Sequence, residues 1–164
     1  MATFSRSAEV RWTGDVMHGS GEVVAASGAF VVPIRFPSTL GEPPGKTTPE
    51  ELLAASHATC FGIGLRSVIG RRGGSASRVI VSATVTAEKG SAGIRILSSH
   101  LEGVVEGLEK IDEADLPDIG REVAEGCTIS AAIRGTVEIT PKIGAAESIQ
   151  PASRESPSKP ARAT

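Results

Sequence analysis

Hydrophobic and polar residues alternate at the start of the chain, as they do along a half-buried β-strand. In residues 8–13, Ala8, Val10 and Trp12 fall on one side, and polar residues fall on the other. A glycine-rich turn follows, and a second strand is expected over residues 22–26. The pattern therefore predicts that the fold opens with a β-hairpin.

A helix is expected to begin after Thr48. Thr48 can serve as the N-cap, Pro49 suits the first helical position, and Glu51 completes a capping box. No residue in the stretch 52–65 is charged. A helix that is apolar on every side is typical of burial on all sides. We therefore expect a central helix that runs to about residue 69 and is surrounded by sheet or by another subunit.

The rest of the chain predicts two longer strands, a second helix and a last strand. Alternation over 79–86 and a less regular pattern over 94–105 predict two strands joined by a glycine turn. A helix is expected over 116–126 with Asp115 as its cap, followed by a strand over 133–140. Because strands and helices do not alternate as βαβ units, the fold class is α+β with an antiparallel sheet.

Two segments lack these patterns. Residues 37–49 hold four prolines and two glycines, which predicts a long loop. Residues 144–164 are rich in serine, proline and alanine, and we expect them to form a disordered tail. The chain is thus interpreted as one domain over residues 1–143 followed by the tail.

Composition narrows the classes of function. The 164 residues carry a net charge of about −2, which gives no strong field to attract nucleic acid or an anionic membrane. The uncharged stretch 52–65 is shorter than the roughly 20 residues that span a bilayer, and the first residues lack a signal-peptide core. We therefore expect a cytoplasmic protein with neither membrane nor nucleic-acid partner. In that reducing compartment, its two cysteines are not expected to form a structural disulfide.

Cys60 and Cys127 are the residues best suited to carry chemistry, although each is equally acceptable as a small buried hydrophobe. Cys60 lies inside the apolar helix, and it needs a nearby cation to become reactive. His57, three residues earlier, and Arg35, which lies among apolar residues, are candidates for that cation. Without such a role, His57 would be a hydrogen-bonded histidine in the core, and Arg35 would be an ordinary surface arginine. His57, Cys60 and Cys127 lack the number and spacing of zinc ligands, so no metal is expected.

Two segments around these cysteines resemble the signature of the OsmC/Ohr family, the osmotically inducible and organic hydroperoxide resistance proteins. The first reads TPEELLAASHATCF over residues 48–61, and the second reads GCTIS over residues 126–130. An Arg-Gly pair follows the second segment. The residues WTGD at 12–15 are similar to the OsmC branch rather than to the Ohr branch. The resemblance covers roughly residues 5–142.

The resemblance implies an intertwined homodimer, with antiparallel sheets wrapped around central helices. It also implies a thiol-dependent peroxidase that reduces organic hydroperoxides without a metal or another cofactor. Cys60 would be the peroxidatic cysteine and Cys127 the resolving one. Arg35 and Glu50 fall where the family places its active-site arginine and glutamate. A disulfide formed from the Cys60 sulfenic acid would be reset by an external dithiol, often of lipoyl type.

Two points refine this expectation. Glu50 and Cys60 are ten residues apart, which is about 15 Å of rise on a straight helix, so either Glu50 orients Arg35 or the helix is irregular. The family usually has proline after the second cysteine, and Thr128 in its place frees a backbone N–H. Two other hypotheses stay open, namely a peroxide-sensing or small-molecule-binding protein without efficient turnover, and a structural dimer with inert thiols.

Overall fold

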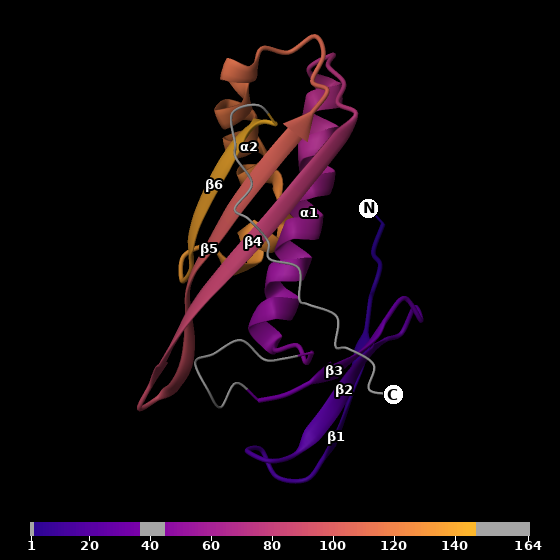
Figure 1. Cartoon of the computed structure of the whole chain (residues 1–164), viewed down its shortest axis with the longest axis vertical. Coiled ribbons are helices and arrows are strands. Elements are labelled where there is room, and N and C mark those ends of the chain that lie inside the picture. The colour runs from indigo at the N-terminus through magenta and orange to yellow at the C-terminus, as the bar shows by residue number, and fades with distance from the viewer. Residues whose placement is uncertain (1, 37–44, 147–164) are drawn as a thin grey trace, which may run out of the picture.

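The computed structural model describes residues 2–36 and 45–146, which form two three-stranded sheets and a long helix, α1 (Pro49–Arg71). The smaller sheet lies beside the first turns of α1, whereas the larger sheet runs along the helix (Figure 1). The smaller sheet contains β1 (Ala8–Thr13), β2 (Ser20–Ala25) and β3 (Val31–Ile34). The remaining elements are β4 (Arg78–Gly90), β5 (Gly93–Glu106), a short 3₁₀ turn (Glu113–Asp115), α2 (Leu116–Gly126), α3 (Thr128–Ile133) and β6 (Glu138–Ala145).

The predicted hairpin is confirmed. β1 and β2 pair antiparallel, and Trp12 lies opposite Gly21. The sequence pattern did not predict β3, because Pro33 interrupts its short run of apolar residues. Proline is tolerated there because β3 is the edge strand of the sheet, and β2 is its neighbouring strand.

The predicted start of α1 is also confirmed. The Thr48 side chain accepts a hydrogen bond from the Glu51 backbone N–H. The Glu51 carboxylate accepts a hydrogen bond from the Thr47 hydroxyl at 2.7 Å, so the capping box lacks its reciprocal bond to Thr48. The helix ends at Arg71, and Gly73 follows with a left-handed backbone at φ 80°. Most of the loop expected before this helix, residues 37–44, lies outside the described residues.

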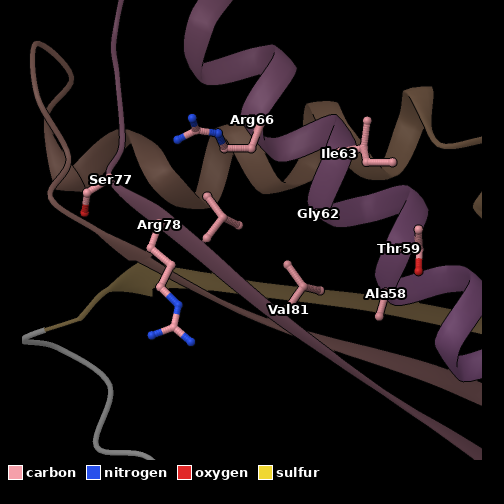
Figure 2. Close-up of a pocket in the computed structure, with 9 residues that line it drawn as sticks. Ala58, Thr59, Gly62, Ile63, Arg66, Ser77, Arg78 and Val81 are labelled. Carbon is pink, nitrogen blue, oxygen red and sulfur yellow. The ribbon is translucent and has the colours of Figure 1, made fainter.

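Within one chain, α1 is covered on one side, and its expected burial by another subunit stays a prediction. Phe61, Leu65 and Ile69 are fully buried, but Ile63 is 68% exposed. Figure 2 shows Thr59 and Ile63 pointing outward, away from β4. The larger sheet and α2 cover only one side of the helix, because an isolated α+β layer offers no second surface to cover the other.

By length and composition alone, α1 could also cross a membrane. An 18-residue window of this 23-residue helix has a mean hydropathy of 1.4. The helix is longer than the 14-residue uncharged stretch from which the sequence argued against a membrane span. A core helix of a globular protein meets the same criterion.

The larger sheet departs from the prediction in one pairing. β4 and β5 pair antiparallel along their whole length, but β6 pairs parallel to β5. The sheet is therefore mixed rather than antiparallel throughout. The parallel pairing follows from the crossover through α2 and α3. This crossover brings the chain back toward the N-terminal end of β5 before β6 begins.

The last strand begins later than the sequence predicted. Ile133 is the final residue of α3, and Gly135 then turns the chain with φ at 95°. β6 starts at Glu138 and runs to Ala145, which is buried and lies past the predicted domain limit at residue 143. Residues 147–164, most of the predicted tail, lie outside the described residues.

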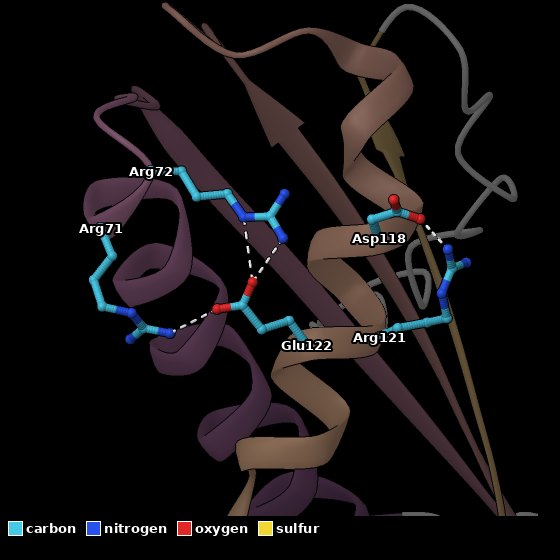
Figure 3. Close-up of polar contacts among 5 residues, drawn as sticks. All are labelled: Arg71, Arg72, Asp118, Arg121 and Glu122. Atoms are coloured by element: carbon cyan, nitrogen blue, oxygen red, sulfur yellow. Dashed lines mark hydrogen bonds and ion pairs between the residues drawn. The ribbon is translucent and has the colours of Figure 1, made fainter.

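Helix α2 is attached to the end of α1 by charged side chains (Figure 3). The Glu122 carboxylate accepts hydrogen bonds from Arg71 at 3.0 Å and from Arg72 at 2.7 Å. These two guanidinium groups, Arg72 foremost, hold the pKa of Glu122 below its usual value. Asp118 and Arg121 form a further ion pair along α2. Because α2 leads directly into Cys127, these contacts help to position the second cysteine.

Asp115 is not the side-chain cap that the sequence predicted for α2. It lies at the end of the 3₁₀ turn and makes no capping hydrogen bond to α2. Asp112 instead caps the 3₁₀ turn by accepting from the Ala114 backbone N–H at 2.9 Å. The start of α2 contributes to the core through Leu116, which is fully buried.

Candidate active site

The two cysteines meet at the middle of α1. Cys127 joins α2 to α3, and its thiol donates to the Cys60 sulfur at an Sγ–Sγ distance of 2.8 Å. Both residues are free thiols. A disulfide bond is about 2.05 Å long, so small side-chain movements are enough to join the pair. The fold thus brings together two nucleophiles that lie 67 residues apart in sequence.

The two thiols differ in their exposure. Cys127 is buried, with 4% of its surface accessible, whereas Cys60 is partly exposed. A molecule that approaches from solvent therefore reaches the Cys60 sulfur first. The arrangement suits a pair in which Cys60 reacts with an external molecule and Cys127 reacts with Cys60.

Hydrogen bonds favour the ionised form of Cys60. Burial by itself raises the pKa of the Cys60 thiol. Hydrogen bonds from the Cys127 thiol, the Ile129 backbone, and the Thr128 hydroxyl and backbone outweigh that effect and lower the pKa below its ordinary value. Since the thiolate is the reactive form of cysteine, this environment activates Cys60.

The backbone donors are available because of how α3 begins. Cys127 has an extended backbone, and its carbonyl accepts the first intrahelical bond, from the Ala131 N–H. The N–H groups of the first residues of a helix have no acceptor within it. The N–H groups of Thr128 and Ile129 are therefore directed at the Cys60 sulfur instead. A proline at position 128 would lack one of these donors.

His57 is a hydrogen-bonded core residue. It is fully buried, with Nδ1 at 2.8 Å from the Ser99 hydroxyl and Nε2 at 2.8 Å from the Ser130 hydroxyl. Burial lowers its pKa, which keeps the ring neutral at neutral pH. His57 is therefore not the cation that activates Cys60. It connects α1 to β5 and holds Ser130 three residues after Cys127.

Ser99 and Ser130 are site-supporting residues that sequence reasoning missed. Both side chains are fully buried, which is uncommon for serine unless it is hydrogen-bonded. Ser130 belongs to the second cysteine motif, and that membership was the only signal in the sequence. Ser99 had none, because its contact with His57 depends on how β5 packs against α1.

Arg35 lies beside the first turn of α1, whereas the thiols lie at the middle of the helix. It follows β3, and its backbone N–H donates to the Thr47 carbonyl at 3.1 Å. Its side chain lines an apolar pocket of about 450 Å³ together with Trp12, Phe36 and Leu52. Leu52 precedes Cys60 by eight residues, or about 12 Å of helix rise.

Glu50 lies in the first turn of α1, also far from Cys60 along the helix axis. It lines a second pocket of about 450 Å³ with Glu51 and Ala83. Within the described part of one chain, the hydrogen bonds given to the Cys60 sulfur come from Cys127, Thr128 and Ile129. The structure thus brings together two of the four predicted site residues.

A further pocket, of about 600 Å³, lies between α1 and β4 (Figure 2). It runs along the outward face of α1 at Thr59 and Ile63, with Arg66 and Arg78 at one end. Cys60 does not line it. Across residues 2–36 and 45–146, no three His, Cys, Asp or Glu side chains are placed to bind one metal ion.

Comparison with known proteins supplies the family. The sequence model described as "OsmC-like protein" matches residues 41–142. The peroxiredoxin OsmC of Escherichia coli (strain K12) is 29% identical over 138 residues, which span 84% of this chain and 95% of that protein.

Solved structures share the fold. An organic hydroperoxide resistance protein OsmC from Legionella pneumophila superposes with a TM-score of 0.70 at 24% identity, over 88% of this chain and 99% of its own. The organic hydroperoxide resistance protein OhrB of Bacillus subtilis gives a TM-score of 0.64 at 23% identity, over 84% and 97% of the two chains. At these identities the likeness concerns the fold.

Proposed function

This chain belongs to the OsmC-like protein family, and on that premise we propose that it is a thiol-dependent peroxidase that reduces organic hydroperoxides to alcohols. The observation that carries the proposal is the Cys60–Cys127 pair, with its sulfurs 2.8 Å apart and with hydrogen bonds that favour the Cys60 thiolate. The name of the Escherichia coli relative supports the reaction class, and the names of the two structural neighbours support the substrate class.

The first step is attack by the Cys60 thiolate on the distal oxygen of the hydroperoxide. The O–O bond breaks, Cys60 becomes a sulfenic acid, and the alkoxide takes a proton and leaves as the alcohol. Cys60 suits this role because it is the more exposed of the two thiols and its pKa is lowered. Cys127 is shielded from direct attack because it is buried.

The second step joins the two cysteines. The Cys127 sulfur attacks the sulfenic sulfur, water leaves with the oxygen, and a Cys60–Cys127 disulfide forms. An external dithiol of lipoyl type then reduces the disulfide by thiol–disulfide exchange. A transient disulfide of this kind fits a cytoplasmic location, where the cell keeps thiols reduced.

We further propose that the active protein is a homodimer and that Arg35 reaches Cys60 from the partner subunit. Two observations support this. Arg35 and Cys60 are separated along α1 within one chain, and the outward face of α1 carries an exposed Ile63. A second copy that covers this face would exclude water from Ile63 and bring the smaller sheet toward Cys60. Glu50 would then orient the Arg35 guanidinium.

The apolar pocket around Arg35 supports alkyl hydroperoxides as the substrate class. Apart from Arg35, side chains of apolar and aromatic residues line it, among them Trp12, Phe36 and Leu52. If Arg35 lies over the Cys60 of a partner, the same pocket receives the alkyl group of the substrate. Hydrogen peroxide has no alkyl group to occupy it.

The decisive test is the mass of the intact protein after one equivalent of cumene hydroperoxide, without reducing agent. We expect a loss of two hydrogens, mapped by peptide digestion to a Cys60–Cys127 disulfide within one chain. Cys127→Ser should instead gain one oxygen at Cys60 and stop after one turnover, and Cys60→Ser should remain unchanged. If both thiols stay free in the native protein, the peroxidase proposal is wrong.

A steady-state assay separates an enzyme from a sensor. A peroxidase should consume many equivalents of cumene hydroperoxide with dihydrolipoamide as reductant. An equal concentration of hydrogen peroxide, the matched substrate without an alkyl group, should be consumed more slowly. A protein that forms the disulfide but turns over with no dithiol would be a peroxide sensor on the same fold.

A further inference from the structure

Thr128 lies next to both reacting sulfurs. It directly follows Cys127, and its hydroxyl oxygen is 3.6 Å from the Cys60 Sγ. The two atoms belong to residues 68 positions apart, so the contact depends on the docking of α3 against α1. A hydroxyl can donate one hydrogen, and a hydrogen bond to an ionised acceptor is stronger than one between neutral groups.

We propose that Thr128 is a further residue of the catalytic site, whose hydroxyl donates a hydrogen bond to the Cys60 thiolate before it attacks the peroxide. This inference rests on the proposed role of Cys60 as the attacking thiolate. It requires no movement of the backbone, because the oxygen and the sulfur are already in contact.

The position of Thr128 lets it act on the sulfur in two ways. Both its hydroxyl and its backbone hydrogen-bond to Cys60, and both lower the pKa of the thiol. A proline at this position offers neither donor. Thr128 therefore provides two hydrogen-bond donors at a position where the OsmC/Ohr signature usually has proline, which provides none.

A thiolate held by hydrogen bonds has a distinctive kinetic signature. A lower pKa increases the fraction of thiolate below the midpoint, but it also decreases the intrinsic nucleophilicity of that thiolate. Loss of the Thr128 hydroxyl should therefore decrease the reaction rate of Cys60 at a pH below the midpoint of its ionisation. Above that midpoint, the same loss should increase the rate. A variant that only disturbs the structure should react more slowly at every pH.

The test is the pH dependence of Cys60 alkylation by iodoacetamide, followed by mass spectrometry of the Cys60 peptide. Thr128→Val keeps the shape and the backbone N–H but loses the hydroxyl. We expect its midpoint to rise by about half a pKa unit, which is threefold less thiolate at a given pH below the midpoint. Because the thiolate of the variant is also more nucleophilic, alkylation should slow only about twofold below the midpoint. On the alkaline plateau it should be slightly faster than in the native protein.

Two further variants provide matched controls. Thr128→Ser keeps the hydroxyl and should give the native profile. Thr128→Pro removes both donors and should shift the midpoint further than Thr128→Val does. Proline should be accepted at the first position of α3, because Cys127 already has the extended backbone (φ −73°, ψ 124°) that a residue before proline adopts.

The proposal is wrong if Thr128→Val alkylates with the native midpoint, or if Thr128→Ser shifts as far as Thr128→Val. If Thr128→Val does not fold, as judged by circular dichroism, the Thr128→Ser and Thr128→Ala pair isolates the hydroxyl in the same way. Alkylation needs no peroxide or dithiol. The profile therefore decides the role of Thr128 even if the protein proves not to be a peroxidase.

Discussion

At the scale of single residues, His57 is the support on which the thiol site depends. Its two ring nitrogens bond to Ser99 and Ser130, so one neutral ring connects α1, β5 and α3 in the core. In a neutral imidazole one nitrogen donates and the other accepts, and a serine hydroxyl can pair with either. Protonation would place a charge in the core, and it would leave the hydroxyl that donates to the ring without its acceptor.

This arrangement predicts acid-sensitive stability. The pKa of His57 is lowered in the folded protein, so the unfolded chain binds a proton that the folded chain does not. The stabilisation is complete above the unfolded pKa of about 6.5 and is lost progressively as the pH falls from there toward the lower folded value. Urea unfolding at a series of pH values should show this decline.

The His57→Leu variant tests the assignment. It should unfold more easily at neutral pH by about 3 kcal/mol, because two buried hydroxyls lose their partner. Below pH 6.5, its free energy of unfolding should also fall less steeply with decreasing pH than that of the native protein. An unaltered pH profile in His57→Leu would refute the assignment.

At the scale of elements, the close approach of α1 and α2 positions Cys127. Gly64 faces α2, and a Cβ added there would lie 2.8 Å from the Val123 Cγ1 atom. Val123 is buried and stiff at its branched Cβ, so it has little room to move aside. Gly64 therefore lets the two helices approach closely, in a helix where alanine would otherwise be preferred.

Two matched substitutions in α1 should therefore act in opposite directions. Gly64→Ala should lower the free energy of unfolding by about 1 kcal/mol, because overpacking outweighs the gain in helix propensity. Gly70→Ala has open space around its Cβ and should raise the free energy of unfolding by about 0.5 kcal/mol. Thermal unfolding of both variants measures the difference, and equal shifts would contradict the packing argument.

At the scale of the whole molecule, one chain leaves several large apolar side chains exposed. Across residues 2–36 and 45–146, the exposed large hydrophobic residues are Phe4, Val10, Val16, Met17, Phe30, Val31, Ile63 and Ile80. Most of them lie on the smaller sheet, in its connecting turns or on the outward face of α1. Surfaces of this kind mark interfaces, which supports the proposed dimer.

Ile63→Glu should disrupt that dimer. A carboxylate on the outward face of α1 would be buried without a partner, so we expect a shift toward monomer in analytical ultracentrifugation. Hydroperoxide consumption should fall at least tenfold, since Arg35 could no longer reach Cys60 from a partner. Ile63→Leu preserves the apolar surface and should remain dimeric and active. A monomeric native protein with full activity would contradict the proposal.

Much of the architecture could be predicted because its signals are local. Period-two alternation marked β1, and a cap followed by proline marked the start of α1. The errors arose where a distant partner decides the outcome. Ile133 alternates like a strand residue but ends α3, and β6 pairs parallel to β5 because of the crossover that precedes it.

The same division holds at the candidate site. The sequence by itself determined which residues can do chemistry, since the motifs around Cys60 and Cys127 identify the family and both thiols. Only the tertiary structure decided that these two sulfurs are in contact and that His57 is neutral and bonded to two serines. It also decided that Arg35 lies beside the start of α1, away from Cys60. A motif records residue types and spacing along the chain. Distance, burial and hydrogen bonding between segments arise only when the helices and sheets pack together.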